Sequence, residues 1–117
     1  MKDDNIILKK SFVFAVSEVN LYKYLTESKK EFVLSKQLLR CATSIGANVE
    51  EEIGAQSKAD FLAKFGIAYK EARETQYWIR LLKETNFLND KEAESILNDD
   101  EELLKIIGKI QVSTKKA

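Results

Sequence analysis

The stretch SKADFLAKFGIAYKEARETQYWIRLLKETN, from Ser57 to Asn86, decides the fold. It contains no Pro and one Gly, and a stripe of apolar and small residues recurs at alternating steps of four and three: Phe61, Phe65, Ala68, Ala72, Thr75, Ile79 and Leu82. At about 100° per residue, this spacing keeps all seven on one side of a helix. About thirty residues at roughly 1.5 Å each make a rod of about 45 Å, which cannot bury its own stripe. The stretch therefore predicts a long central helix, over about residues 58–86, with other helices packed along it.

Short signals predict where the helices begin and end. Ser57, followed three residues later by Asp60, resembles a capping box at the start of the central helix, although that motif prefers Glu or Gln. Ser35 is a suitable cap for the helix before it, and the segment Gly54-Ala55-Gln56 ends that helix, with Gly54 in the left-handed position. Asp90 is expected to cap the last helix.

Three further amphipathic segments predict helices over about residues 6–28, 36–53 and 91–112. A strand over residues 12–16 is the alternative in the first, but the apolar run is too long and too helically periodic for one. The first helix is expected to bury a broad apolar set: Ile7, Leu8, Phe12, Ala15, Val16, Val19, Tyr22 and Leu25 or Tyr24. The other two are expected to bury one line each: Leu38, Ala42, Ile45, Val49 and Ile53 in one, and Ala93, Ile96 or Leu97, Leu103 or Leu104, Ile107 and Ile110 in the other.

The composition limits the class of protein and its partners. The 117 residues suffice for one domain with a real core, and 44% apolar with 32% charged residues suit a helical protein with solvated outer faces. Lys plus Arg equals Asp plus Glu, 19 each, so the net charge does not indicate duplex nucleic acid or an anionic membrane as a partner. With one Cys, no apolar run of membrane-spanning length and a charged N-terminus, the sequence predicts a cytoplasmic protein.

Four amphipathic helices with short connections predict an all-α fold: an antiparallel up-down-up-down four-helix bundle in a single domain. The central helix is apolar over more than one stripe, whereas a monomeric bundle needs only one. Tyr77, Trp78 and Leu81 supply the surplus, which either covers the end of the bundle or forms a contact between subunits. We favour the subunit contact and therefore expect a homo-oligomer.

Candidates for metal binding or catalysis are few. Glu51, Glu71 and Glu74 are the residues for a carboxylate-rich site, because bundles of this size hold metals with Glu residues and Glu-x-x-His pairs on facing helices. The chain has no His, so we expect no metal, no cofactor and no catalytic triad. Cys41 lies among apolar residues with no His to activate it, and is expected to be a buried structural thiol. No enzyme is predicted.

Polar and basic residues are the candidates for a binding surface. A polar stripe runs beside the apolar stripe of the second helix: Gln37, Arg40, Ser44, Asn48 and Glu51. It is either a structural network, with Arg40 paired to Glu71 or Glu74, or a binding surface. Arg40, Arg73 and Arg80 are the candidate nucleic-acid contacts. Acidic residues interleave with these basic residues, so a monomer would present a salt-bridged, solvated face, whereas a ring would gather the charges on one rim or in one channel.

The segment QLLRCATSIGANVEEEIGAQSKADFLAKFGIAYKEARETQYWIRLLKETNFL, residues 37–88, closely resembles the centre of the four-helix-bundle proteins encoded in intervening sequences of bacterial 23S ribosomal RNA genes. Those proteins have been mislabelled as ribosomal proteins. The residues that carry the resemblance are Gln37, Arg40, Ala42, Ser44, Ile45, Asn48, Glu51, Ser57, Phe61, Ala68 and Glu74. Two positions depart from the pattern: Gly46 replaces the usual Pro, and Glu52 replaces the usual Gly.

This resemblance implies an antiparallel bundle that assembles as a homopentamer. It also implies kinship with the accessory variability determinant proteins of diversity-generating retroelements, which look like basic, barrel-shaped pentamers that bind nucleic acid and a reverse transcriptase. The present chain is neutral instead. We therefore expect a non-enzymatic, homo-oligomeric binding or scaffold protein, with RNA or an RNA-handling protein as partner. The alternatives are a carboxylate-rich metal-binding or enzymatic bundle and a regulatory ring that binds another protein.

Overall fold

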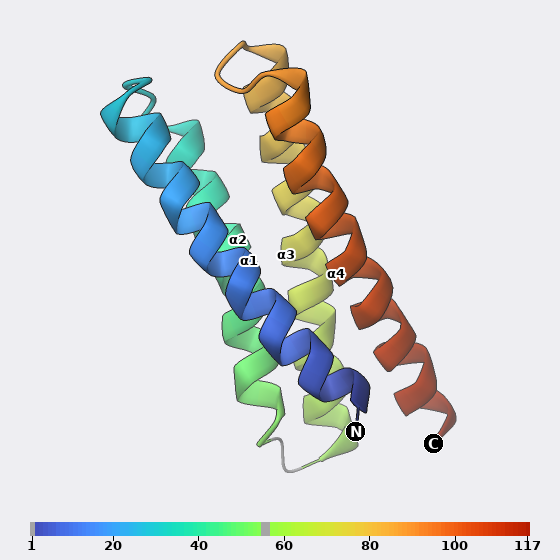
Figure 1. Cartoon of the computed structure of the whole chain (residues 1–117). Coiled ribbons are helices and arrows are strands. Elements are labelled where there is room, and N and C mark those ends of the chain that lie inside the picture. The colour runs from blue at the N-terminus through green and yellow to red at the C-terminus, as the bar shows by residue number, and fades with distance from the viewer. Residues whose placement is uncertain (1, 55–56) are drawn as a thin grey trace.

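A computed structural model of the chain describes residues 2–54 and 57–117. This part contains no strand and folds into four α-helices: α1 (Lys2–Glu27), α2 (Leu34–Glu52), α3 (Lys58–Glu84) and α4 (Asp90–Lys116). The helices lie side by side in a body that measures 46 × 21 × 19 Å along its principal axes, and consecutive helices run in opposite directions (Figure 1). This arrangement confirms the all-α four-helix bundle that the sequence predicts.

The four helices form a closed ring of contacts. α2 packs against α1 and α3, α3 packs against α4, and α4 closes the ring by contacting α1. The α1–α4 contact is the smallest of the four. Both ends of the chain lie at the end of the bundle where α2 leads into α3 (Figure 1). In the described residues, no helix is both long enough and apolar enough to cross a membrane.

The central helix α3 buries the stripe that its sequence predicts. Its fully buried members are Phe65, Ala68, Ala72, Thr75, Ile79 and Leu82. Phe61, the first member of the stripe, is half-buried and stacks on Phe65 with 4.6 Å between the ring centroids. Leu38 and Ile45 of α2 and Ile107 of α4 are at most 2% exposed in the same core. Each such side chain contributes about 1.5–3 kcal/mol by burial, so the core around α3 holds the bundle together.

The caps of α3 and α4 follow from local sequence, with one correction. The Ser57 side chain accepts a hydrogen bond of 3.1 Å from the backbone N–H of Asp60, as the sequence predicts. The cap of α4 is Asn89, and the expectation of Asp90 is wrong by one residue. Asn89 Oδ1 accepts from the N–H of Glu92 at 2.8 Å, and the Glu92 carboxylate accepts from the N–H of Asn89 at 2.9 Å. Such a reciprocal pair satisfies two N–H groups, which a cap at Asp90 would not.

The start of α2 differs from the prediction. Ser35 lies inside the first turn, and the helix begins at Leu34. The Glu31 carboxylate caps it, because it accepts from the backbone N–H groups of Val33 at 3.0 Å, Leu34 at 2.8 Å and Ser35 at 2.7 Å. The Ser35 hydroxyl donates back to the Glu31 carbonyl at 2.7 Å. A longer side chain three residues before the helix therefore replaces the expected serine cap.

The end of α2 also differs. Gly54 does not adopt the left-handed conformation that was expected of it. Ile53, the C-cap, keeps right-handed dihedral angles of −62° and −22°, so no reversal is needed at the glycine. Ala55 and Gln56 lie outside the described residues. The left-handed turn occurs instead after α3, where Asn86 has a φ of 69°.

The buried face of α1 is rotated from the face that its apolar residues predict. The core-facing line is Ile7, Ser11, Phe14, Glu18 and Leu25. Phe12, Val16 and Val19, which were expected to be buried, are 64%, 47% and 37% exposed. The cause is the close approach of α2: a Cβ atom on Gly46 would lie 3.3 Å from the backbone oxygen of Ser11. Small residues at this crossing bring the Ser11 side of α1 inward and turn Phe12 outward.

The outer helices are longer than predicted, and one buried position is wrong. α1 begins at Lys2 rather than near residue 6, and α4 continues to Lys116 rather than ending near residue 112. Most of the expected line of α4 is buried: Ala93, Leu103, Leu104, Ile107 and Ile110. Ile53, the last member of the line expected for α2, is instead 47% exposed. It lies beyond the last turn of α2, where the helix no longer holds it against the core.

Candidate functional site

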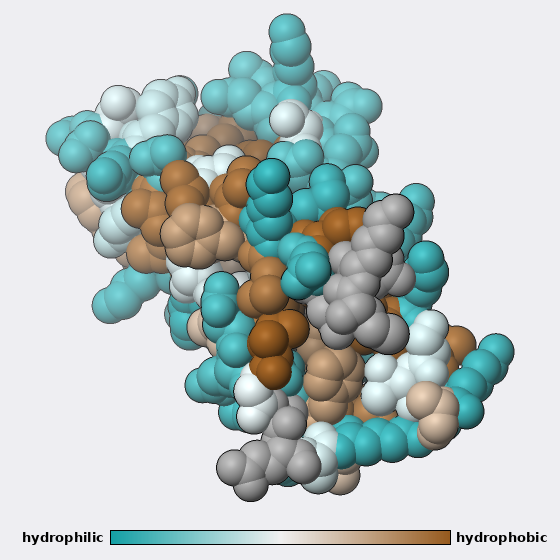
Figure 2. Space-filling view, turned by 60° about the horizontal axis from the view of Figure 1, so that its bottom comes forward, coloured by the Kyte–Doolittle hydropathy of each residue, from teal (hydrophilic) through white to brown (hydrophobic). Residues whose placement is uncertain are grey.

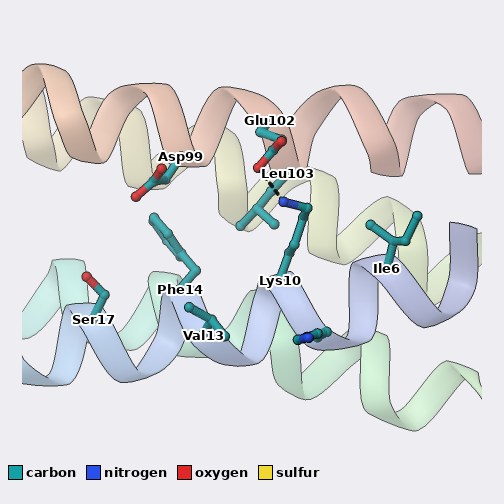
Figure 3. A pocket seen from close by; sticks show the side chains of 9 residues that line it. Ile6, Lys10, Val13, Phe14, Ser17, Asp99, Glu102 and Leu103 are labelled. Atoms are coloured by element: carbon teal, nitrogen blue, oxygen red, sulfur yellow. Dashed lines mark hydrogen bonds and ion pairs between the residues drawn. The ribbon is translucent and has the colours of Figure 1, made fainter.

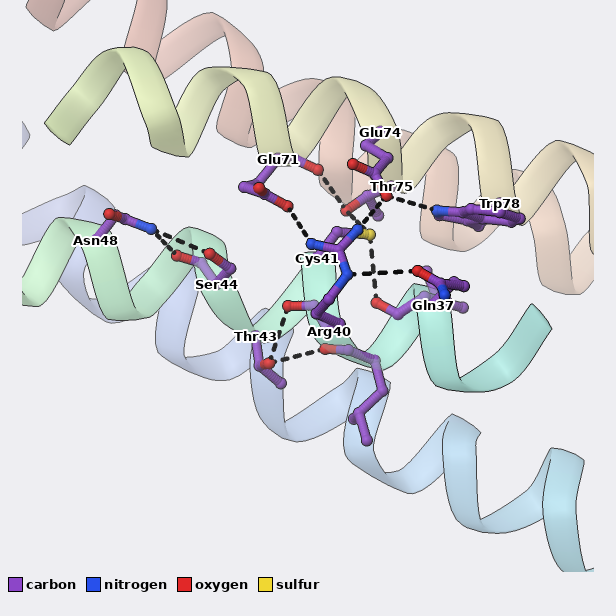
Figure 4. A network of polar contacts seen from close by, with 12 residues as sticks. Gln37, Arg40, Cys41, Thr43, Ser44, Asn48, Glu71, Glu74, Thr75 and Trp78 are labelled. Atoms are coloured by element: carbon purple, nitrogen blue, oxygen red, sulfur yellow. Dashed lines mark hydrogen bonds and ion pairs between the residues drawn. The ribbon is translucent and has the colours of Figure 1, made fainter. Parts of the chain in front are cut away.

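A polar network joins α2 to α3 around Arg40 (Figure 4). Glu71 and Glu74 lie one helical turn apart on α3, so both carboxylates face the same residue of α2. Arg40 Nη1 donates to Glu71 Oε2 at 3.2 Å, and Arg40 Nη2 donates to Glu74 Oε2. Arg40 Nε donates to Gln37 Oε1 at 3.4 Å within α2. The sequence-based pairing of Arg40 with the two acids is present in this geometry.

Two further contacts extend this network. Trp78 Nε1 donates to Glu74 Oε2 at 2.9 Å, so one carboxylate binds both the guanidinium and the indole. Beneath it, the Thr75 hydroxyl lies 2.8 Å from the Glu71 carbonyl oxygen and 3.2 Å from Cys41 Sγ. The network therefore runs from the surface to a buried thiol, and it fixes the register of α2 against α3.

The electrostatics of the network limit what Arg40 can bind. Its guanidinium faces two carboxylates, so the cluster of Arg40, Glu71 and Glu74 carries a net negative charge. Three guanidinium nitrogens already donate hydrogen bonds. The Arg40 side chain is 51% exposed, so each ion pair contributes at most about 1 kcal/mol. A phosphate group at this position would have to displace a carboxylate, which makes the cluster a poor anion site.

The other candidate nucleic-acid contacts lie elsewhere. Arg73 and Arg80 are exposed on α3, seven residues apart, and neither makes an ion pair within residues 2–54 and 57–117. Arg73 lines a small hollow against α4, with Glu101 and Lys105 beside it. At about 100° per residue, Arg73 and Arg80 point away from the side of α3 that faces Arg40. The structure therefore does not bring the three arginines together in one subunit.

The rest of the polar stripe is also bonded. Asn48 Nδ2 donates to the Ser44 carbonyl at 2.8 Å and to Ser44 Oγ at 3.0 Å, within α2. Lys64 of α3 donates to Glu51 Oε2 at 2.7 Å. This hydrogen bond raises the pKa of Lys64 above its ordinary value. The stripe is thus a partly exposed line of local bonds along the junction of α2 and α3.

The acids proposed for a metal site are separated. Glu71 and Glu74 both bind Arg40, whereas Glu51 binds Lys64. Among the residues that the structure describes, no three potential ligands from His, Cys, Asp and Glu form a metal-binding group. The carboxylate-rich alternative therefore receives no support from the geometry.

Cys41 is buried as predicted, with no exposed surface. Burial raises the pKa of its thiol to about 11, with a smaller opposing effect of the hydrogen bond from Thr75. The Sγ atom lies 3.4 Å from the Leu38 carbonyl oxygen. Because a thiolate is the reactive form of cysteine, this thiol is unreactive near neutral pH.

The residues expected at a subunit contact are only partly exposed. Tyr77 is 50% exposed, whereas Trp78 and Leu81 are half-buried. Tyr77 and Trp78 pack edge to face with ring centroids 5.0 Å apart. Trp78 also packs against the core, so part of its ring is already buried within the subunit.

The exposed apolar surface on α1 was not predicted from the sequence. Phe12, Val16 and Val19 follow one another at steps of four and three, and so form one exposed stripe, which we call the α1 apolar face. Phe12 borders a hollow of about 320 Å³ between α1 and α2, whose lining includes Ala15 and Gly46. Figure 2 shows apolar side chains reaching the surface between polar ones. The available signal was the breadth of the apolar set of α1, which exceeds what one buried stripe needs.

Comparisons with known proteins agree with this architecture. None of the curated proteins compared with the chain matches it. A crystal structure of a protein of unknown function from the S23 ribosomal protein family of Bacteroides thetaiotaomicron is 51% identical, with a TM-score of 0.92. The match covers 93% of this chain and 97% of that chain. The sequence model of the family described as 23S rRNA-intervening sequence protein matches residues 3–109. The chain therefore belongs to the family of 23S rRNA-intervening sequence proteins.

Proposed function

We propose that the protein is a non-enzymatic scaffold that assembles with further copies of itself through the α1 apolar face and binds a macromolecular partner as an assembly. The observation that supports this function is the exposure of Phe12, Val16 and Val19 on one side of α1. Soluble monomers rarely expose a contiguous apolar patch of this kind, whereas subunit interfaces use them. The buried Cys41 thiol is unsuited to act as a nucleophile near neutral pH, which agrees with the non-enzymatic part of the proposal.

The shape of this surface favours contact between identical subunits. Phe12 is a large projecting side chain, and the hollow beside it is flanked by the small residues Ala15, Gly46 and Ala47. A projection and a hollow on the same face suit a head-to-tail contact, in which each subunit inserts into the next. Such contacts close into rings when the rotation between subunits allows it. The homopentamer that the family resemblance implies is one such ring.

The charge distribution favours a protein as the partner of the assembly. The chain has no net charge, and Arg40 is neutralised by two carboxylates. Arg73 and Arg80 remain as exposed cations, so RNA is the other outcome to test. Nucleic-acid binding depends strongly on salt because it releases counterions, whereas contacts between neutral protein surfaces do not. The salt dependence of the assembly and its partner therefore separates the two classes.

The test is the mass in solution by light scattering at micromolar concentration. We expect a closed oligomer for the natural chain and a folded monomer for the double variant Phe12→Asp/Val16→Asp. The matched control is Ile67→Asp/Val112→Asp, which places the same charges at exposed apolar positions of α3 and α4 that are 41% and 53% exposed. The control is expected to keep the oligomer. A monomeric natural protein, or equal loss of assembly in both variants, would contradict the proposal.

The partner is tested on protein purified from its native cell with and without nuclease, at low and high salt. A protein that remains bound to the assembly after nuclease and high salt supports the protein-binding scaffold. Nucleic acid that is lost on nuclease or salt treatment would show an RNA-binding ring instead. Arg73→Ala and Arg80→Ala would then be the first variants to measure, since these side chains are unpaired within the described residues.

A further inference from the structure

Two acidic side chains lie inside the bundle between α1 and α4. Glu18 belongs to the core-facing line of α1, and Asp100 to that of α4, and they are 1% and 0% exposed. Glu18 Oε1 and both carboxylate oxygens of Asp100 have no hydrogen-bond partner within the part of the chain that the structure describes. A buried, unpartnered carboxyl group is costly, and an ionised one is far more costly than a protonated one.

The surroundings of the pair make ionisation harder still. Burial, the first cause, raises the pKa of both groups to about 8. The charged groups that add to this are acidic: Asp99 acts on Glu18, and Glu18 and Glu101 act on Asp100. A side-chain hydrogen bond from Ser17 only partly offsets the effect at Glu18. Desolvation and like charges therefore act in the same direction at this site.

Within the part of the chain that the structure describes, no cation is among the groups that shift the pKa of the pair. The core-facing residues of α2 and α3 are uncharged except Glu52. Burial raises the pKa of Glu52, and the charged groups that act on it are Lys64, Asp60 and Glu51 rather than the pair. On α1, Lys10 is bound to Glu102 at 3.1 Å across the surface of the α1–α4 contact. The pair is thus left with neighbours that favour its protonated form.

Glu18 and Asp100 lie at the smallest of the four contacts between helices, which is that of α1 with α4. A groove of about 480 Å³ runs along it, and Figure 3 shows Phe14, Lys10 and Ser17 of α1 facing Asp99 and Glu102 of α4 across this groove. Ser17 and Asp99 at the groove are the sequence neighbours of Glu18 and Asp100 in the core. The groove therefore brings solvent to the helix segments that carry the two buried carboxyl groups.

We propose that Glu18 and Asp100 form a pH-responsive latch, which holds α1 against α4 while both carboxyl groups carry protons and lets the two helices separate as they ionise. In the closed state the protonated groups tolerate burial. After ionisation, two negative charges repel each other across the contact, and each gains hydration only by leaving the core. The contacts of α1 with α2 and of α4 with α3 are both larger, so they persist while α1 and α4 separate along the groove.

The sign of the pH dependence follows from linkage. The closed state holds the protons more tightly than the open state, in which the carboxyl groups have ordinary values near 4.5 and 3.8. Closure is therefore fully favoured below those ordinary values, and it weakens as the pH rises from there to about 8. Each group changes the opening equilibrium by at most about tenfold per pH unit over this range.

The first experiment titrates the two carboxyl carbons of the natural protein by 13C NMR. We expect both resonances to titrate well above the ordinary range of carboxylic acids. Because this measurement needs no substitution, it does not depend on whether a variant folds. Titration of both groups below about pH 5 would overturn the latch, since that value is ordinary for a solvated carboxyl group.

The second experiment measures amide hydrogen exchange between pH 5.5 and 8.5, corrected for the intrinsic pH dependence of exchange. In the natural protein we expect the opening constants of α1 and α4 amides at their contact to rise about tenfold or more over this range. We also expect them to exceed the opening constants of α2 and α3 amides near their contact, which open only when the whole bundle unfolds. Asp100→Asn, which mimics the protonated side chain, is expected to remove most of the rise, and Glu18→Gln is the second variant. Glu94→Gln, an exposed acid on the same helix, is the matched control and keeps it.

Two results of this experiment would contradict the proposal. One is an unchanged pH dependence in Asp100→Asn and Glu18→Gln. The other is equal opening constants for all four helices, which would show cooperative unfolding of the whole bundle rather than separation of α1 from α4. Larger opening constants for α1 and α4 at their contact, which rise with pH in the natural protein and not in the two variants, support the latch.

Discussion

Glu31 lies between α1 and α2 and accepts hydrogen bonds from three consecutive backbone N–H groups. Burial acts to raise the pKa of this carboxyl group, but the hydrogen bonds from Ser35, Leu34 and Val33 outweigh it, and the pKa lies below its ordinary value. The side chain reaches the helix because Lys30 before it adopts a left-handed conformation with a φ of 55°. A single charged residue thus satisfies N–H groups that would otherwise lack partners at the start of α2.

We predict that Glu31→Gln lowers the free energy of unfolding by about 1–2 kcal/mol at pH 7, because an amide accepts weaker hydrogen bonds than a carboxylate. The contribution of the carboxylate is present above its ordinary value of 4.5 and is lost as the pH falls through the lowered pKa of the folded state. Urea unfolding from pH 3 to pH 7 measures both. Glu27→Gln, at an exposed position at the end of α1, is the control and is expected to be nearly neutral. Equal costs for the two variants would contradict the capping role.

At the residue scale, one part of the site could be predicted from the sequence and another part could not. The sequence offered Glu71 or Glu74 as the partner of Arg40, and the structure pairs Arg40 with both, because the two acids lie one turn apart on one face of α3. The cap at Glu31 does not follow in the same way, because it depends on the backbone turn at Lys30 rather than on a short motif. Local spacing can be derived from periodicity alone, whereas a contact made through an irregular turn needs the geometry of that turn.

At the scale of the helices, the crossing of α1 and α2 sets how α1 is rotated. Gly46 is buried against the backbone of Ser11, and a Cβ atom there would meet the Ser11 oxygen at 3.3 Å. Gly108 on α4 has more room, since its added Cβ would lie 3.7 Å from the Tyr69 ring. Gly46 and Gly108 therefore offer a matched comparison of the same substitution in a tight contact and in an ordinary one.

We predict opposite signs for alanine at these two glycines. Gly108→Ala is expected to raise the free energy of unfolding by about 0.5–1 kcal/mol, because alanine favours the helix and makes an ordinary contact. Gly46→Ala is expected to lower it by about 1 kcal/mol, because the backbone of α1 has to move away and this loss exceeds the gain in helix propensity. Thermal unfolding followed by circular dichroism measures both. Stabilisation by Gly46→Ala would show that the crossing is less tight than the distance indicates.

The helices also differ in how far the sequence predicts them. The stripe of α3 is confirmed almost residue by residue, because apolar and polar positions separate cleanly around that helix. α1 carries apolar residues on more than one face, so periodicity alone placed Phe12 and Val16 inside. Its core line includes Ser11 and Glu18, which a search for hydrophobic residues does not identify as buried. The rotation of an evenly apolar helix is set by its neighbours, and that information is tertiary.

At the scale of the whole molecule, a few groups determine how stability depends on pH, because the other charges balance. The 19 acidic and 19 basic residues cancel near neutral pH, so general charge repulsion is small. Glu31 loses its stabilising effect in acid, because its pKa is lowered. Glu18 and Asp100 destabilise the folded state as the pH rises toward 8, because their pKa values are raised. These opposite effects place maximum stability in mildly acidic solution.

We predict that the free energy of unfolding falls by at least about 2 kcal/mol between pH 5.5 and pH 8, because the unfolded state releases the protons of Glu18 and Asp100 more readily. Urea midpoints across this range provide the measurement. Asp100→Asn should flatten the profile and make the protein more stable than the natural chain at pH 8. A natural profile that rises over the same range would contradict the prediction, since it would mean that the folded state binds fewer protons than the unfolded state.

The lone thiol of the chain has a practical consequence. Cys41 is fully buried beside Thr75, at the junction of α2 and α3. A thiol-specific dye can modify it only in molecules whose α2 has transiently left α3, so the labelling rate of the natural sequence reports how often that junction opens. No engineered label or second cysteine is needed, and modification of any other thiol cannot confuse the signal, because the chain has no other. The labelling rate of Cys41 therefore measures how often α2 and α3 separate in the natural protein.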